Sequence, residues 1–166
     1  MKKFLLTLVA AATTAVSSWA VGPGDIAYGG NLTIAPVVES GVSLTNFGIG
    51  AKFQYGLAEN LRAELDMDYF FKSSHIDIFD MAVNAHYLFN FSNDEAAIYP
   101  IVGIGFGALH TSYMGVSDSE ARFLANIGVG AQYDFTDRLV GCIEWKYQYM
   151  SNFSRMPISV GIAYKF

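Results

Sequence analysis

Three polar residues in the second half of the sequence are of the types that carry out nucleophilic catalysis. His110 and Ser112 stand two positions apart, and Glu120 follows further along the chain. A serine hydroxyl becomes a nucleophile when a histidine accepts its proton and a carboxylate orients that histidine. One hypothesis is therefore a hydrolase or an acyltransferase. The motif is weak, because residues of these types are common in polar loops.

A larger set of charged residues recurs at alternate positions of the chain. Cations and anions nearly balance, and opposite charges fall on neighbouring segments, so the pattern favours internal ion pairs over a catalytic carboxylate pair. The residues of this expected network are Lys52, Arg62, Glu64, Asp66, Asp68, Asp80, Arg122, Asp134, Glu144 and Lys146, with Lys165 in the same register. His86 shares the register, and we expect a hydrogen-bonded internal group there rather than a metal ligand. No cofactor is expected.

The segments that carry these residues have the period of β-strands. In residues 46–57 the odd positions, from Phe47 to Leu57, are apolar, and the even positions hold glycine, amides and a lysine. Residues 61–71 repeat the alternation after a short turn at 58–60. Successive side chains of a strand point to opposite faces, and a connection this short joins antiparallel strands. The two segments therefore predict a β-hairpin.

The same alternation continues along the chain and predicts eight strands. They are residues 25–35, 46–57, 61–71, 78–89, 97–110, 121–135, 139–149 and 157–166. The connections at 58–60, 90–96 and 136–138 are mostly short, and those at 36–45, 72–77, 111–120 and 150–156 are mostly longer. Such an alternation of short turns and longer loops is typical of membrane barrels. We therefore expect an all-β fold, an eight-stranded antiparallel transmembrane β-barrel of the up-and-down type.

The bulk of the apolar faces indicates which side of the barrel points outward. These faces carry many aromatic rings, among them Phe53, Trp145 and Tyr147, whereas the opposite faces carry glycines such as Gly103 and Gly128. An eight-stranded barrel has an interior only just wide enough for its own side chains. The rings are therefore expected outside, where so large an apolar surface requires lipid. A soluble barrel such as a lipocalin would need the opposite arrangement.

The first residues have the pattern of a cleaved secretory signal. Lys2 and Lys3 precede an apolar stretch that is too short to span a bilayer, and Ser18-Trp19-Ala20 supplies small residues for a cleavage site. We expect residues 1–20 to be a signal peptide and residues 21–166 to form the barrel domain.

Composition narrows the class of partner. The chain has one cysteine, Cys142, so a disulfide framework is excluded. The net charge of −5 is spread without a basic block, which argues against a nucleic-acid partner.

The last predicted strand carries a specific pattern. Its apolar residues alternate up to two aromatic residues, and the pattern resembles the β-signal read by the outer-membrane barrel-assembly machinery. The residues are Ile158, Val160, Ile162, Tyr164 and Phe166. Together with the stretches 99–107 and 128–139, it makes nearly all of 25–166 similar to the outer-membrane β-barrel domain family, with its small eight-stranded OmpA-like, OmpX-like and opacity-type porin-family barrels. The resemblance implies a location in the outer membrane of a Gram-negative bacterium.

A resemblance of this kind implies a fold and a membrane more than an activity. We expect a non-enzymatic scaffold with four extracellular loops, a packed polar lumen and no large pore. Its expected partners are outer-membrane lipid, the assembly machinery through the last strand, and an extracellular protein through the loops; a monomer is expected. Two alternatives remain open. One is a deacylase-like enzyme acting on lipid A, although the asparagine-bearing surroundings of that family are absent around His110, and the other is a small low-conductance pore.

Overall fold

The computed structural model describes residues 22–38, 45–73, 76–91, 95–113, 116–151 and 153–166. Within these ranges, the side chains at 72–73, 76, 110–113, 116–120 and 153 are not described. The expected signal peptide, residues 1–20, therefore lies outside the described residues. In the described part of the chain, no helix is long and apolar enough to cross a membrane.

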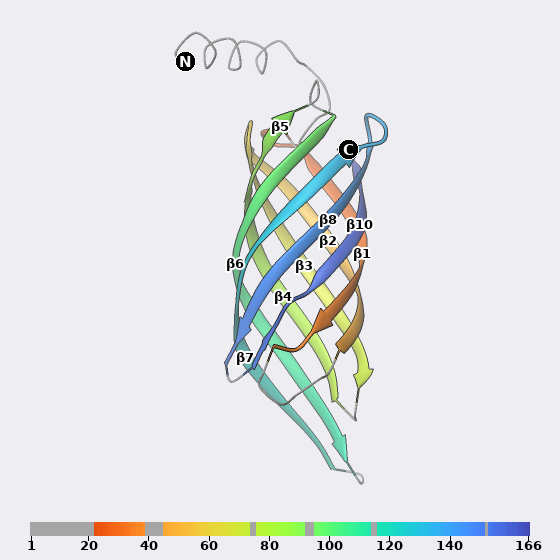
Figure 1. Cartoon of the computed structure of the whole chain (residues 1–166), viewed down its shortest axis with the longest axis vertical. Helices are drawn as coiled ribbons and strands as arrows, with labels where there is room; N and C mark the ends of the chain where they lie inside the picture. The colour runs from red at the N-terminus through yellow and green to blue at the C-terminus, as the bar shows by residue number, and fades with distance from the viewer. Residues whose placement is uncertain (1–21, 39–44, 74–75, 92–94, 114–115, 152) are drawn as a thin grey trace.

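The described residues form β-strands joined by turns (Figure 1). The strands are β1 (Ile26–Pro36), β2 (Thr45–Ala58), β3 (Leu61–Ser73), β4 (Ile76–Tyr87), β5 (Phe89–Phe91), β6 (Ala96–Tyr113), β7 (Val116–Asp134), β8 (Leu139–Met150), β9 (Phe153–Arg155) and β10 (Ile158–Lys165). Each pairs in antiparallel fashion with its neighbour in sequence, with two exceptions. Both β4 and β5 pair with β6, and both β9 and β10 pair with β8.

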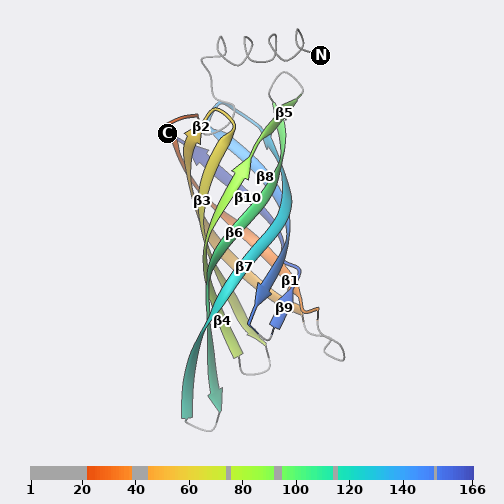
Figure 2. The ribbon, with the colours of Figure 1, turned by 90° about the vertical axis from the view of Figure 1, so that its left-hand side faces the viewer.

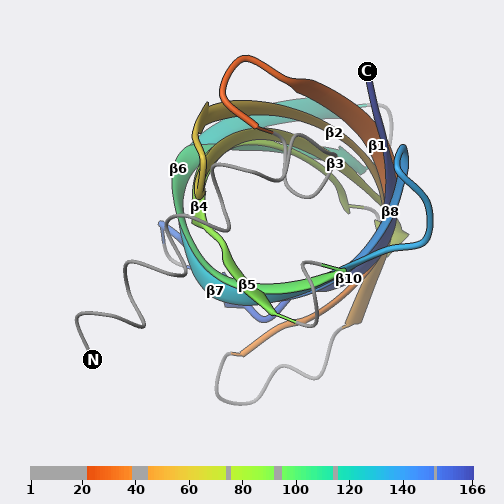
Figure 3. The ribbon, with the colours of Figure 1, turned by 90° about the horizontal axis from the view of Figure 1, so that it is seen from above.

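The sheet closes on itself because β10 pairs with both β8 and β1. The short β5 continues β4, and the short β9 leads into β10, so the wall contains eight strands. The view along the barrel shows that they form a closed ring (Figure 3). The predicted eight-stranded antiparallel barrel is confirmed. Closure gives each of the eight wall strands a partner on both sides, which is the condition for a sheet to cross lipid.

The division between β4 and β5 has a local cause in the neighbouring strand. The pairs His86↔Ile101 and Phe89↔Ile98 keep one register, so Tyr87 faces Pro100. Proline has no N–H and cannot donate to the ladder. The wall therefore lacks one hydrogen bond between Pro100 and Tyr87. On the other side of the strand, the N–H of Leu88 donates to the carbonyl oxygen of Asn60, in the turn before β3, at 2.8 Å.

Two of the predicted loops are wrong in their extent. Residues 111–120 were expected as a loop, but β6 and β7 continue pairing as far as Tyr113↔Val116. The two strands form a ribbon that projects beyond the rest of the barrel, at the end away from the C-terminus (Figures 1 and 2). The segment 150–156 was also expected as a loop, but it contains β9. In both places strand pairing continues through residues that lack a clear apolar face, because backbone hydrogen bonds are independent of side-chain polarity.

The alternation of side chains fixes an apolar outside and a polar inside. Outward Ile104 and Val129 are 62% and 54% exposed, whereas inward Lys52 and Glu144 are 2% and 1% exposed. Inside the barrel, an apolar cluster of Leu88, Ala97, Tyr99 and Ile101 lies toward the end that carries the C-terminus, and a second one of Ala35, Phe70 and Ile78 lies toward the other end. A third buried apolar cluster is formed by Ala82, Leu124 and Met150, and the ion pairs of Lys52 and Lys146 lie in the middle of the lumen.

Candidate functional site

The centre of the lumen is occupied by the ammonium group of Lys52. Its Nζ lies 3.3 Å from Glu64 Oε1 and donates a short hydrogen bond to Glu144 Oε2. A second ammonium, of Lys146, lies 2.5 Å from Asp66 Oδ2 and 3.6 Å from Glu144 Oε2. These residues come from β2, β3 and β8, whose inward positions alternate with apolar outward ones. The result is a series of ion pairs of alternating charge across the barrel.

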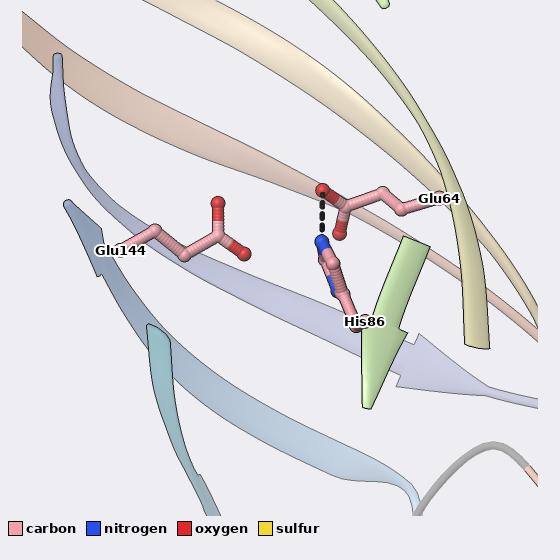
Figure 4. Close-up of side chains that lie close together, drawn as sticks. All are labelled: Glu64, His86 and Glu144. Atoms are coloured by element: carbon pink, nitrogen blue, oxygen red, sulfur yellow. Dashed lines mark ion pairs between the residues drawn. The ribbon is translucent and has the colours of Figure 1, made fainter. Parts of the chain in front are cut away.

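Arg62 holds His86 of β4 beside this series of ion pairs. The guanidinium Nε and Nη2 lie 3.2 Å and 3.0 Å from His86 Nδ1. A guanidinium can only donate, so Nδ1 is the acceptor and the imidazole proton resides on Nε2. That N–H points toward Glu64 Oε1, 3.7 Å away (Figure 4). His86 is thereby held by Arg62, and its Nε2 is directed at Glu64 from beyond hydrogen-bond distance.

Glu64, His86 and Glu144 are the one group of described residues with the spacing of metal ligands. Their ligand atoms lie within 4.8 Å of one another. The chemistry does not fit a metal, because a ligating Nε2 would have to lose its proton while Arg62 still donates to Nδ1. The ammonium of Lys52 also already contacts both carboxylates. We assign the group to the ion-pair layer, in line with the interpretation of His86 as a hydrogen-bonded internal group.

The side chain of Tyr99 extends along the lumen side of the sheet, over the neighbouring strand β7, to reach Glu144 on β8. Its hydroxyl donates to Glu144 Oε1 at 2.9 Å, and its ring stacks on His86 with centroids 4.8 Å apart. The ring lies against Gly130, which stands between Tyr99 and Glu144 in the ladder, so a Cβ at this glycine would collide with it. Sequence reasoning missed Tyr99 because aromatic residues were assigned to the outer face. Its place in the inward register with Gly103 was the available signal.

A second buried cluster lies around Arg155. Its guanidinium donates to Asp80 Oδ2 and Gln148 Oε1, and its Cζ lies 4.0 Å from the centroid of the Phe70 ring. The side chain is fully buried. Arg155 was missed because it falls in the segment expected to be a loop. The inward period of the last strand, continued across Pro157, would have found it.

The other members of the expected network have separate partners. Asp68 accepts hydrogen bonds from Asn31 at 2.8 Å and from Thr33 at 3.4 Å. Asp134 lies 2.5 Å from the ammonium of Lys165 near the end of the barrel. Arg122 is half-buried and donates to the carbonyl oxygen of Ser151 at 3.2 Å. The network is therefore several clusters along the lumen rather than one.

The three residues of the enzyme hypothesis lie in the ribbon formed by β6 and β7. The ladder pairs His110 with Ser119, Ser112 with Ser117, and Glu120 with Leu109. Glu120 and His110 therefore stand in successive rows of the ladder. Their side chains belong to the part of the chain that the structure does not describe.

The residues of the expected assembly pattern line the seam where the barrel closes. Ile158, Val160 and Ile162 are exposed on the outer face. Beyond them, the ring of Phe166 stacks on Tyr28 of β1 with centroids 4.7 Å apart, and Tyr164 lies beside both rings. The backbone N–H of Phe166 donates to the carbonyl oxygen of Ile26 at 3.0 Å.

Solved structures with the same architecture come from several bacteria. Neisserial surface protein A superposes with a TM-score of 0.75 at 16% identity, covering 85% of this chain and 97% of that protein. The attachment invasion locus protein Ail of Yersinia pestis gives a TM-score of 0.65 at 19% identity, covering 87% and 99%. OprG of Pseudomonas aeruginosa gives 0.55 at 12% identity, covering 90% and 99%. At these identities the likeness establishes the fold alone.

Comparison with sequences is more specific. No curated protein matches the chain. The profile of the outer membrane protein beta-barrel domain matches residues 4–166. That match covers the whole barrel, and the apolar outer face requires lipid. The chain is therefore a member of the outer membrane protein beta-barrel family and resides in the outer membrane of the cell.

Proposed function

We propose that this protein is a non-enzymatic scaffold of the outer membrane that presents the ribbon of β6 and β7 to partners outside the cell. The observation that carries this proposal is the length of these two strands, 18 and 19 residues, against 8 to 14 in β1–β4, β8 and β10. A tilted strand needs only about 9–11 residues to cross a bilayer. The excess length extends the sheet beyond the membrane.

The orientation of the ribbon follows from the connections. Barrels of this class place short turns on the periplasmic side and longer structures outside the cell. Here β2 and β3 are joined through Glu59 and Asn60 alone, and β7 and β8 through residues 135–138, all at the end opposite to the ribbon (Figure 2). The ribbon therefore faces the exterior.

The ribbon offers backbone groups as well as side chains to a partner. In the described ladders, pairing of β8 with β7 reaches Leu124 and goes no further, whereas β7 begins at Val116. The N–H of Ser151 still donates to the carbonyl oxygen of Phe123. The edge of β7 before Phe123 presents N–H and C=O groups to which an extended segment of another protein can add as a strand. We infer that an extracellular protein is the partner class.

The filled lumen supports a scaffold over a pore. Lys52, Glu64, Arg62 and Glu144 are each buried to 2% exposure or less, and the ion pair of Lys52 with Glu144 joins β2 to β8, which are not neighbours in the ring. An eight-stranded barrel has room for little besides such side chains. The enzyme alternative has less support. Glu120 and His110 stand in successive rows of the ladder, and successive rows belong to opposite faces of a sheet.

The proposal is tested by shortening the ribbon without opening the barrel. His110 and Ser119 are a ladder pair, so replacing residues 111–118 by Asn-Gly joins them through a two-residue hairpin turn. Wild-type and shortened proteins in nanodiscs are passed over immobilised extracellular matrix proteins, and retention of the barrel is checked by heat-modifiable gel mobility. We expect binding by the wild type and its loss in the shortened protein. Equal binding by both, or binding by neither, contradicts the proposal.

A further inference from the structure

The outer wall carries one groove that the functions above do not use. It has a volume of about 740 Å³ and crosses β5, β6, β7, β8 and β10. Its sides are the tall residues Phe89, Ile98, Ile143 and Trp145, and its low centre is formed by Pro100 and Ala131. Tyr99, Gly130 and Glu144 also line it, but on the lumen side the Tyr99 hydroxyl donates to the Glu144 carboxylate, which also accepts from Lys52.

The shape of the groove follows from the ladder. Ala131 stands between Ile98 and Ile143 in one outward-facing row of the ladder. Pro100 lies in the next outward-facing row, with Val129 and Trp145. A small residue and a proline thus stand side by side among large ones, which lowers the surface along an oblique line. The lining presents apolar side chains to the surroundings, and the surroundings of this face are lipid.

We propose that this groove is a binding site for an acyl chain of a phospholipid in the inner leaflet. Its chemistry argues against a headgroup, because Glu144 is the one charged residue among the described lining residues and it is paired with Lys52 on the lumen side. Its depth favours the inner leaflet, given the orientation inferred above. Trp145 is the sixth residue after Leu139, where β8 begins, and a strand tilted by about 35–45° rises about 15 Å over that length. That is half of a hydrocarbon core about 30 Å thick.

The test compares two phenylalanine substitutions on the same strand. Ala131→Phe fills the groove, whereas Ala125→Phe adds the same side chain at an outward alanine between Ile104 and Tyr149, outside the groove. Protein purified from the outer membrane in mild detergent is examined by native mass spectrometry, which counts bound lipids and identifies them by mass. Both variants are first checked for heat-modifiable mobility, and Ala131→Leu serves if Ala131→Phe does not fold.

We expect one phospholipid adduct on the wild type and on Ala125→Phe, reduced at least several-fold on Ala131→Phe. A location readout comes from Trp145, which is the only tryptophan besides Trp19. In a Trp19→Phe background, one equivalent of phosphatidylethanolamine with brominated acyl chains should quench Trp145, and the Ala131 substitution should abolish that quenching. An adduct with the mass of lipid A, an adduct that Ala131→Phe leaves unchanged, or no adduct on the wild type would overturn the proposal. Because none of these readouts involves the ribbon, the result is independent of the proposed surface interaction.

Discussion

The hydroxyl of Tyr99 donates a 2.9 Å hydrogen bond to Glu144 from two strands away, across the backbone of Gly130. This contact joins β6 to β8 inside the wall, and through Glu144 it is connected to Lys52 and Lys146. The stack of Tyr99 on His86 adds β4 to the same assembly. One glycine therefore permits a side-chain connection that extends across the sheet and into the lumen.

The first prediction concerns Gly130. In Gly130→Ala the new Cβ would occupy the position of the Tyr99 ring, so the ring must move and its bond to Glu144 is lost. Overpacking of this kind costs about 1–3 kcal/mol of folding free energy. The measurement is urea unfolding of the barrel in lipid vesicles. Gly30→Ala is the control, because a Cβ there meets only the carbonyl oxygen of Gly50, at 3.4 Å. Equal stability of the two variants would show that the Tyr99 bridge contributes little.

The second prediction concerns the central ion pair. Lys52→Met leaves the carboxylates of Glu64 and Glu144 buried without their shared ammonium, and removing one partner of a buried pair costs about 3–5 kcal/mol. Adding Glu144→Gln should recover part of this loss, since one of the two uncompensated charges is then removed. Unfolding free energies of the two single variants and the double variant form the cycle. As a control, Lys52→Met combined with Ile104→Ala on the outer face should be additive. Additivity in the Lys52 and Glu144 cycle as well would contradict a coupled pair.

The third prediction concerns the two faces of the wall. Ile104 is outward in the middle of β6, and Arg at such a position costs about 2–4 kcal/mol near the bilayer midplane. Gln132 is inward and its Oε1 accepts a 2.8 Å hydrogen bond from Arg62, so Gln132→Glu places a new charge opposite a cation. Refolding titrations in lipid should rank Ile104→Arg as far more damaging than Gln132→Glu. The reverse order would mean that the faces are exchanged.

Much of this arrangement follows from the sequence, because the pleat of a strand imposes a period of two. The alternation along 46–57 and 61–71 was enough to assign Lys52 and Glu64 to the same side of the wall. It could not show that Lys52 reaches Glu144. In the ladder Lys52 stands beside Asp66, yet its long side chain contacts Glu64 and Glu144, and Glu144 lies on a strand distant in the sheet. Such contacts depend on the stagger of the closed barrel and on side-chain length.

Arg155 shows the other limit of sequence reasoning. Pro157 breaks the apparent strand, so the inward period was not followed back to Arg155, although the residue pairs with Asp80 and Gln148. The ribbon of β6 and β7 is likewise not predictable from side-chain period, because residues 111–120 do not alternate between an apolar and a polar face. Its backbone pairing nevertheless continues to Tyr113↔Val116.

The fourth prediction concerns the seam between β10 and β1. Phe166→Ala removes the ring that stacks on Tyr28, which should lower the folded stability only modestly, because that surface faces lipid. If the alternating residues from Ile158 to Phe166 also serve as the assembly signal, the amount of barrel in the outer membrane should fall far more than the unfolding free energy does. Quantitative immunoblots of membrane fractions are compared with refolding in detergent. Tyr28→Ala removes the other half of the stack and is the control. An equal loss of barrel from the outer membrane in the two variants would mean that Phe166 contributes packing only and contradict its role in the assembly signal.

The display of the β6 and β7 ribbon outside the cell is the central claim, and its most direct test is the accessibility of two inserted tags. A short epitope between Met114 and Gly115 extends the ribbon, and the same epitope between Asp137 and Arg138 extends the turn at the opposite end. Antibody binding to intact cells is measured before and after the outer membrane is permeabilised. The account predicts that the first tag is bound on intact cells and the second only after permeabilisation. Binding of the second tag on intact cells, with the first one hidden, would contradict it.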